Sequence, residues 1–317
     1  EAVQQVVQAI AKYENVTVLA SSAQLAHAKG RLESSGVRVV EAALDDIWLR
    51  DTGPTFLVRR GPAEGASSVL MGVSWKFNGW GGKFPPWDAD AQLSSEILKM
   101  QSIPEVACEM ILEGGGFCTD GDGTVLVTES CLLNPNRNPN LSRNAIEENL
   151  IDFLGVTKII WLPSGLLCDV DTDGHVDNFA CFGRPGLVLL AWCEDASDPQ
   201  AEVCEEALGI LQRSSDARGR KLEVVKLPLP PPMFYSEDES KSVAGGARRT
   251  GERIPGSYVN FYIANGGVIV PGFGGPSDEA AEKILTRVFP ERDVVLLPEV
   301  GRTLALGGGN IHCITQQ

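Results

Sequence analysis

The sequence predicts an α/β protein in which five repeated units close into a ring, like the blades of a propeller. Helical and strand patterns alternate along the chain, which indicates a mixed α/β fold. In addition, a polar or glycine-rich turn precedes a strand hairpin at five places, and helical patterns fall between these places. One such unit could not bury its apolar face alone, so the five together favour a closed arrangement.

The predicted helices follow the spacing of apolar residues. Within residues 1–13, Val3, Val6, Val7 and Ile10 recur at the interval of one helical face. Further helices are predicted over residues 21–36, 91–100, 142–154, 199–213 and 277–288, and a β-rich run follows each of them. This order of helix and strand is what alternating α/β units require.

The five predicted hairpins give the units their order along the chain. They lie at residues 48–58, 113–129, 173–192, 257–275 and 306–317. The competing architecture is a doubly wound sheet, which is disfavoured because short glycine-containing hairpins pair strands antiparallel. We expect residues 1–317 to form one domain. Residues 227–256, rich in proline and then in charge, are predicted to form a long surface loop that could cover a site.

The composition narrows the class of partner. The chain has 27 Lys and Arg against 42 Asp and Glu, a net charge of −15. This charge disfavours nucleic acid and anionic membranes, which bind clustered cations, and it suits a small cationic ligand. No apolar run approaches the ~20 residues that a membrane-spanning helix needs. Neither nucleic acid nor membrane is therefore expected as a partner.

The eight cysteines are scattered and form no Cys-x-x-Cys pair, which disfavours a zinc site. No secretory signal is visible, so reduced thiols and a cytoplasmic location are expected. Most of the cysteines lie in apolar runs and are predicted to be small core residues. The chain begins with Glu1 rather than Met, so we expect an upstream segment in the full protein.

The stretch CDVDTDGHVDNFA, residues 168–180, resembles the start of a calcium-binding loop. From Asp169 it reads D-x-D-x-D-G, but the twelfth position is Ala180 instead of the glutamate that such a loop needs. Its flanks also look like strands instead of helices. A calcium site is disfavoured, yet a non-catalytic calcium-binding module stays open as an alternative.

A second interpretation of this stretch is chemical. His175 and Asp177 are two residues apart, so in an extended segment they share a face. Asp51 and Glu113 each open another predicted hairpin unit, and a GGGN run precedes Cys313. Equivalent positions of a pseudo-symmetric ring converge at its axis, which predicts one site with a cysteine, a histidine and several carboxylates. Taken singly, each residue is equally consistent with a turn cap or a core position.

The C-terminal motif carries a second histidine beside the cysteine. If residues 306–317 form a hairpin, His312 and Cys313 point to opposite faces of a strand. We therefore expect His175 to be the partner of Cys313.

Several motifs together resemble one known family. WLRDTGPTF, EGGG, DGHVDN and GGGNIHCITQQ occur in the order found in the agmatine deiminase family, and SYVNFYIANGGVIVPGFG is similar to its plant-type members. The resemblance implies the five-bladed α/β-propeller (pentein) fold, a pseudo-five-fold ring of ββαβ units around a central active site. It also implies hydrolysis of agmatine to N-carbamoylputrescine and ammonia in putrescine and polyamine biosynthesis, without a cofactor or metal, and a homodimer.

The resemblance further implies a role for each candidate residue. Cys313 would be the nucleophile that forms an amidino-thiouronium intermediate, and His175 the general acid and then base. Glu113 would orient His175. The substrate-binding residues would be Asp51 and Asp177 for the guanidinium, Trp48 for the walls of the slot and Asp171 for the distal ammonium.

The identity of the guanidine substrate stays open at this level. The same chemistry could act on peptidyl-arginine or free arginine. An arginine enzyme needs a cation for the substrate carboxylate, and Arg50, Lys83, Arg248 and Arg249 keep that alternative open.

Overall fold

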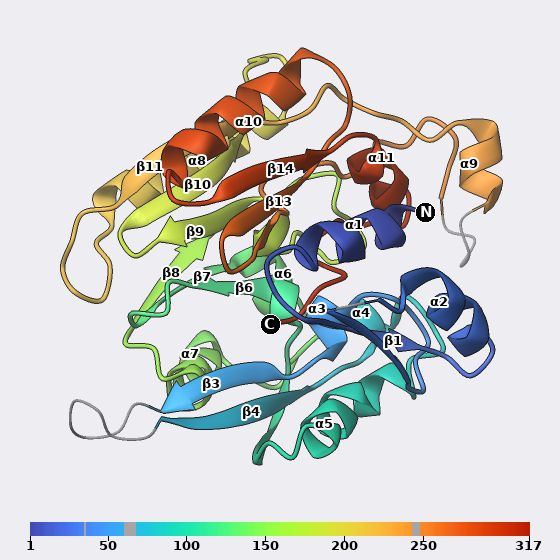
Figure 1. Ribbon diagram of the computed structural model, residues 1–317. Coiled ribbons are helices and arrows are strands. Elements are labelled where there is room, and N and C mark those ends of the chain that lie inside the picture. Colours follow the sequence, from blue (N-terminus) through green and yellow to red (C-terminus); the bar gives the residue numbers. More distant parts are fainter. Residues whose placement is uncertain (35, 60–67, 243–247) are drawn as a thin grey trace.

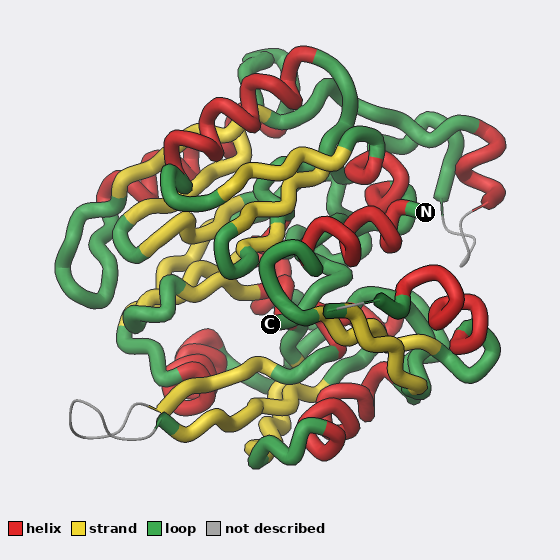
Figure 2. Tube along the Cα trace, viewed as in Figure 1, coloured by secondary structure: helices red, strands yellow, loops and turns green. Residues whose placement is uncertain are grey.

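The computed structural model describes residues 1–34, 36–59, 68–242 and 248–317, and the strands within them fall into five separate sheets (Figure 2). The smallest sheet pairs β1 (Val16–Ala20) in parallel with β2 (Val37–Glu41), and α2 (Leu25–Leu32) connects the two strands. The other four sheets have three strands each. A single doubly wound sheet is therefore excluded for the described residues.

The four larger sheets share one plan. An antiparallel hairpin is followed by a helix, and the third strand then pairs in parallel with the second. The units are β3 (Thr55–Arg59), β4 (Val69–Lys76), α5 (Asp90–Met100) and β5 (Glu105–Ile111); β6 (Phe117–Thr119), β7 (Thr124–Thr128), α7 (Arg143–Leu154) and β8 (Lys158–Leu162); β9 (Ala180–Arg184), β10 (Leu187–Trp192), α8 (Gln200–Arg213) and β11 (Glu223–Pro228); β12 (Tyr262–Ile263), β13 (Gly267–Pro271), α10 (Pro276–Val288) and β14 (Asp293–Leu297). The predicted ββαβ unit is confirmed.

Neighbouring units contact one another in chain order and close into a ring (Figure 1). Helix α7 contacts β5, α8 contacts β8 and α10 contacts β11, so each connecting helix also packs on the preceding unit. The first helix, α1 (Ala2–Ile10), contacts both β1 and the last sheet. Asp90 of α5 accepts a hydrogen bond at 2.8 Å from the backbone N of Asp45, just after β2. These contacts connect the β1–β2 sheet to both the first and the last three-stranded unit, as the propeller-like prediction requires.

Helix α7 begins and ends at residues suited to capping. Ser142 accepts a hydrogen bond from the backbone N of Ala145 at the start of α7, and Gly155, with φ of 67°, ends that helix in the left-handed conformation. The middle strands β7, β10 and β13 are buried along their whole length, because helices and neighbouring sheets cover both faces. This rigid framework holds the turns that carry the candidate residues.

Short helices occupy many of the remaining turns. They are α3 (Leu49–Thr52), α4 (Gly79–Gly82), η1 (Gly114–Gly116), α6 (Glu129–Leu132), η2 (Val176–Asn178), α9 (Glu237–Ser242) and α11 (Val300–Ala305). The predicted long loop over residues 227–256 is thus interrupted by α9, and its residues 243–247 lie outside the described part. No helix of the described residues has the length and apolar character needed to cross a membrane.

The predicted hairpin at residues 306–317 is wrong. Residues 306–317 form turns without a strand, and the C-terminus lies near the middle of the view in Figure 1. The glycines permit close approach in place of strand pairing. A Cβ added to Gly307 or Gly309 would lie 2.9 or 2.5 Å from the ring of Trp48. The run therefore packs its backbone against a tryptophan.

Candidate active site

Three turns and the C-terminal segment meet at one point in the structure. Asp51 lies in α3, Asp177 lies in η2, and α3 and η2 both contact η1. The backbone N of Gly115 in η1 donates a hydrogen bond to Oδ1 of Asp51 at 2.8 Å. A Cβ on Gly115 would lie 2.6 Å from Nδ1 of His175 and 3.0 Å from Oδ2 of Asp177. The EGGG motif thus needs a glycine here because three polar side chains surround it.

The structure brings the five predicted catalytic residues together. Each has at most 6% of its surface exposed, and they are Asp51, Glu113, His175, Asp177 and Cys313. Buried charges are costly unless they are paired, so such a cluster is typical of a functional site.

Cys313 lies between an amide and a carboxylate. Nδ2 of Asn260 donates to Sγ at 3.2 Å, and Oδ2 of Asp177 lies 3.5 Å from Sγ. Oδ1 of Asn260 accepts hydrogen bonds from the backbone N of His312 and of Cys313. Burial, and then the charges of Asp177 and Asp51, raise the pKa of the Cys313 thiol well above its usual value. The thiol is therefore protonated near neutral pH in this arrangement.

His312 and Cys313 share a carboxylate, which corrects the expectation from strand geometry. Nδ1 of His312 lies 2.8 Å from Oδ2 of Asp177, the same oxygen that faces Cys313. The expectation failed because residues 311–314 form a turn, so successive side chains do not alternate. Burial raises the pKa of Asp177, but the hydrogen bond from His312 outweighs it and holds that pKa below the usual range.

His175 lies between two carboxylates. Nδ1 is 3.8 Å from Oδ1 of Asp51, and Nε2 is 3.8 Å from Oε2 of Glu113. Burial lowers the pKa of His175, but the nearby Asp51 carboxylate and other contacts outweigh it and raise that pKa well above its usual value. Burial raises the pKa of Asp51 to about 6. The ring is thus held as a cation near an acid that titrates close to neutrality.

Arg137 fixes Glu113 and was missed by the sequence analysis. Its Nε donates to Oε1 of Glu113 at 2.6 Å, and its Nη1 donates to Oδ2 of Asp173 at 2.7 Å. Burial raises the pKa of Glu113, but the Arg137 guanidinium and His175 outweigh it, so that pKa is lowered. Arg137 therefore ties Glu113 to the turn that precedes His175.

Aromatic side chains line one side of the cluster. Trp48 packs with Phe77, Trp80 and Cys313, the predicted nucleophile. Nε1 of Trp80 donates to Oδ2 of Asp51 at 2.9 Å. The sequence analysis did not select Trp80, because nothing local in the run NGWGGK indicates a bond to a residue 29 positions earlier.

Polar atoms in the centre of the cluster are left without partners. Oε2 of Glu113, Oδ1 of Asp177 and both ring nitrogens of His175 are buried and have no hydrogen-bond partner among the described residues. A guanidinium offers five N–H donors in one plane, and carboxylate oxygens are its preferred acceptors. The free Oδ1 of Asp177, whose other oxygen lies 3.5 Å from Sγ of Cys313, can therefore hold such a group next to the thiol.

The model of the Porphyromonas-type peptidyl-arginine deiminase family matches the chain over residues 1–317. The protein belongs to this family. It is 49% identical to an agmatine deiminase of Pseudomonas syringae pv. tomato and 50% identical to one of Stutzerimonas stutzeri, each over 98% of this chain and 85% of the relative.

Solved structures of agmatine deiminases have the same fold as this chain. An agmatine deiminase of Enterococcus faecalis has a TM-score of 0.90 at 37% identity, covering 100% of this chain and 86% of that one. A cysteine-to-serine variant of the C. jejuni agmatine deiminase with substrate bound has a TM-score of 0.84 at 26% identity, covering 99% and 85%. The mixed α/β fold of the family is therefore confirmed for this chain.

Among the described residues, the turn that resembled a calcium-binding loop, residues 168–180, does not direct a set of free oxygens at one point. Oδ2 of Asp169 accepts from Thr172 at 2.6 Å and from Asn178 at 3.1 Å. Asp171 forms two bonds with Arg248, and Asp173 pairs with Arg137 as described above. Calcium needs six to eight oxygens directed at one point. The calcium-binding alternative thus finds no support in this geometry.

Three of the four cations that kept an arginine substrate open as an alternative already have partners. Nη1 of Arg248 donates to Oδ1 of Asp171 at 2.5 Å, and Nζ of Lys83 lies 2.7 Å from Oδ1 of Asp173. Nη1 of Arg50 donates to Oε1 of Gln316 at 2.5 Å. Asp171, predicted to bind a substrate ammonium, therefore holds an internal guanidinium in this structure.

Proposed function

We propose that this protein is a hydrolase that converts agmatine to N-carbamoylputrescine and ammonia. The relatives that are 49% and 50% identical to it are agmatine deiminases, and so are the two solved structures described above. The observation that carries the proposal is the buried carboxylate of Asp177, whose Oδ2 lies 3.5 Å from the Cys313 thiol and whose Oδ1 has no hydrogen-bond partner among the described residues. Such a carboxylate is suited to a planar cation, and the net charge of −15 attracts one.

In the proposed complex, carboxylates hold the guanidinium of agmatine. Asp51 and Asp177 accept its N–H groups and keep its carbon near Sγ of Cys313. The positive charge of the substrate lowers the raised pKa of the thiol, so that Cys313 loses its proton to water when the substrate binds. Trp48 contributes the apolar wall beside the thiol. Binding therefore creates the nucleophile at the place where it is used.

The first half of the reaction breaks one C–N bond. The Cys313 thiolate adds to the guanidinium carbon and forms a C–S bond in a tetrahedral adduct. Protonated His175 gives its proton to one nitrogen, which leaves as ammonia. The carbon then remains on sulfur as an amidino-thiouronium. Glu113 keeps His175 cationic for this step, which its separation of 3.8 Å from Nε2 supports.

The second half returns the enzyme to its starting state. Neutral His175 takes a proton from a water molecule while the oxygen adds to the thiouronium carbon. The C–S bond then breaks, the hydroxyl proton passes to the departing sulfur, and the carbon becomes the carbonyl carbon of N-carbamoylputrescine. Asp171, which pairs with Arg248 without substrate, is proposed to bind the distal ammonium. A homodimer, a cytoplasmic location and a place in putrescine biosynthesis stay predictions from the family resemblance.

Ammonia release from three guanidines tests this function. Agmatine, free arginine and an arginine blocked at both its amino and carboxyl groups are supplied to the same preparation, the last as a probe for peptidyl-arginine. Because the partly buried carboxylate of Asp171 must pair with the distal group, we expect kcat/KM for agmatine to exceed the others by about 10²-fold or more. Equal or faster release from either arginine compound would assign the site to that substrate instead.

A further inference from the structure

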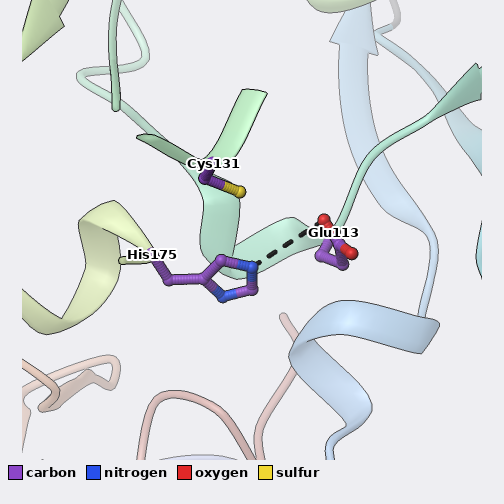
Figure 3. Close-up of side chains that lie close together, drawn as sticks. All are labelled: Glu113, Cys131 and His175. Carbon is purple, nitrogen blue, oxygen red and sulfur yellow. Dashed lines mark ion pairs between the residues drawn. The ribbon is translucent and has the colours of Figure 1, made fainter. Parts of the chain in front are cut away.

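We propose that Glu113, Cys131 and His175 form an inhibitory binding site for a thiophilic divalent cation, with Zn²⁺ as the probe. Figure 3 shows the three side chains pointing toward one another, Cys131 from helix α6 and Glu113 and His175 from the residues just before η1 and η2. One ligand atom of each lies within 4.8 Å of the other two, and all three residues are buried. The inhibition rests on the proposed function, whereas the binding itself does not.

The ligand atoms suit zinc in kind and spacing. A carboxylate oxygen, a thiolate sulfur and an imidazole nitrogen are the three donor types that zinc selects in proteins. In a tetrahedral site with bonds of about 2.0–2.3 Å, neighbouring ligand atoms lie roughly 3.3–3.7 Å apart. Oε2 of Glu113 lies 3.8 Å from Nε2 of His175, so small side-chain movements would close the site. The fourth position would be left for water.

Two of the three ligand atoms have no hydrogen-bond partner among the described residues. Oε2 of Glu113 and Nε2 of His175 form no hydrogen bond with any residue of the described chain, although both side chains are 1% exposed. Oε1 of Glu113 is already bonded to Arg137, which leaves Oε2 directed at the cluster. A buried polar atom without a partner is costly, so a ligand that satisfies both atoms is stabilised.

Cys131 is a fully buried member of an apolar cluster, which is also where a small core residue would lie. Its place beside two buried polar groups distinguishes it from a core cysteine such as Cys204, whose thiol faces the backbone oxygen of Ala191. The charges also balance, because a divalent cation matches one carboxylate and one thiolate. The positive charge of Arg137 near the ion is offset by Asp173, whose Oδ2 lies 2.7 Å from Nη1 of Arg137.

An ion at this site would stop the proposed reaction. It would occupy Nε2 of His175, so that the ring could no longer hold the proton that the leaving ammonia requires. It would also take Oε2 of Glu113 from the histidine that this carboxylate supports. Cys131 takes no part in the proposed reaction. Substituting it therefore tests metal binding without removing a catalytic group.

Direct binding of Co²⁺ to the tag-free protein is the first test, because a cobalt–thiolate bond gives an ultraviolet charge-transfer band. We expect this band in the unsubstituted protein and in Cys313→Ser, and its loss in Cys131→Ser. Competition with a chromophoric chelator should show that Cys131→Ser weakens Zn²⁺ affinity about tenfold or more, whereas Cys313→Ser changes it less than about threefold. Loss of the band in Cys313→Ser with retention in Cys131→Ser, or no band at all, would overturn the proposal.

Inhibition of ammonia release is the second test. We expect Zn²⁺ to inhibit the unsubstituted enzyme at the concentrations at which it binds, and Cys131→Ser to keep turnover yet need about tenfold more Zn²⁺. Cys131→Ala, checked by its thermal unfolding, covers the case in which serine disturbs folding. Unchanged zinc sensitivity in a folded Cys131 variant overturns the site. Zinc binding by a protein that releases no ammonia from agmatine would instead refute the proposed function and leave the cation site in place.

Discussion

Nδ2 of Asn260 lies 3.2 Å from Sγ of Cys313, while Oδ1 of the same amide accepts hydrogen bonds from the backbone N of His312 and Cys313. One fully buried side chain therefore both orients the turn that carries the thiol and points a donor at its sulfur. A donor at this distance stabilises a thiolate more than a thiol.

Asn260→Asp keeps the oxygen acceptor for the backbone but removes the donor to sulfur. We expect the pH at which Cys313 reacts with iodoacetamide to rise, and kcat/KM for agmatine to fall about 10- to 100-fold. Alkylation rates measured across pH without substrate separate this effect from a general loss of structure. Asn265→Asp, at an exposed asparagine of the same segment, serves as the control. An unchanged alkylation profile in Asn260→Asp would contradict the role given to Nδ2.

We expect the protonation of Asp51 to set the pH below which kcat/KM falls, the acid limb of the pH profile. Because burial raises its pKa to about 6, Asp51 is ionised above that pH and takes up a proton below it. A protonated Asp51 cannot pair with a guanidinium, so kcat/KM should be present above pH ~6 and lost as the pH falls through that value.

Trp80→Phe tests which residue causes this limb. It removes the Nε1 donor that favours the ionised form of Asp51, so the limb should move to higher pH. Trp75→Phe, which removes a bond to Thr55 elsewhere in the fold, should leave it in place. A limb at the same pH in all three proteins would assign it to another group.

Arg137 should matter for both stability and turnover. Its side chain and that of Glu113 are each 1% exposed, so Arg137→Gln leaves a buried carboxylate without its cation. Breaking a buried pair from one side costs about 3–5 kcal/mol in the free energy of unfolding, which urea denaturation measures. Lys76→Gln breaks an ion pair with Glu109, whose side chains are 56% and 85% exposed, and should leave unfolding almost unchanged. Similar losses in both variants would contradict this account of Arg137.

Arg248 competes with the substrate if Asp171 binds the distal ammonium. Arg248→Gln frees the carboxylate, so we expect the KM for agmatine to fall about threefold to tenfold with little change in kcat. Asp171→Asn should raise the KM instead, because the carboxylate is lost. Steady-state kinetics of both variants measure the opposite shifts. A higher KM in Arg248→Gln would mean that the arginine positions Asp171 for the substrate.

The sequence predicted much of the fold because its signals are local. Apolar periodicity located α5, α7, α8 and α10, and glycine-rich turns located the hairpins β6–β7, β9–β10 and β12–β13. The predicted range 48–58 holds only the first strand of its hairpin, because β3 pairs with β4 at Val69–Lys76. Residues 306–317 were misinterpreted because a glycine run permits a hairpin turn as well as close packing on Trp48. Only the tertiary neighbour distinguishes the two.

The candidate residues that sequence reasoning missed act through partners far away in the chain. Asn260 lies 53 residues from the Cys313 that it contacts, and Arg137 lies 24 residues from Glu113. Cys131 was grouped with the core cysteines, since no ligand spacing marks its approach to His175. Asp51, Glu113, His175 and Asp177 were selected because each opens a unit whose equivalent positions meet at the axis. Symmetry predicted where acids converge, but it could not predict which amide or guanidinium supports them.

Ammonia release from agmatine by the unsubstituted protein and by Cys313→Ser tests the central claim most directly. Cys193→Ser, which changes a thiol outside the cluster, is measured beside them as the control for handling and folding. The account predicts steady release by the unsubstituted protein and the control, and a loss of about 10⁴-fold or more in Cys313→Ser. Release by a folded Cys313→Ser variant within tenfold of the unsubstituted rate would contradict a covalent mechanism at this residue.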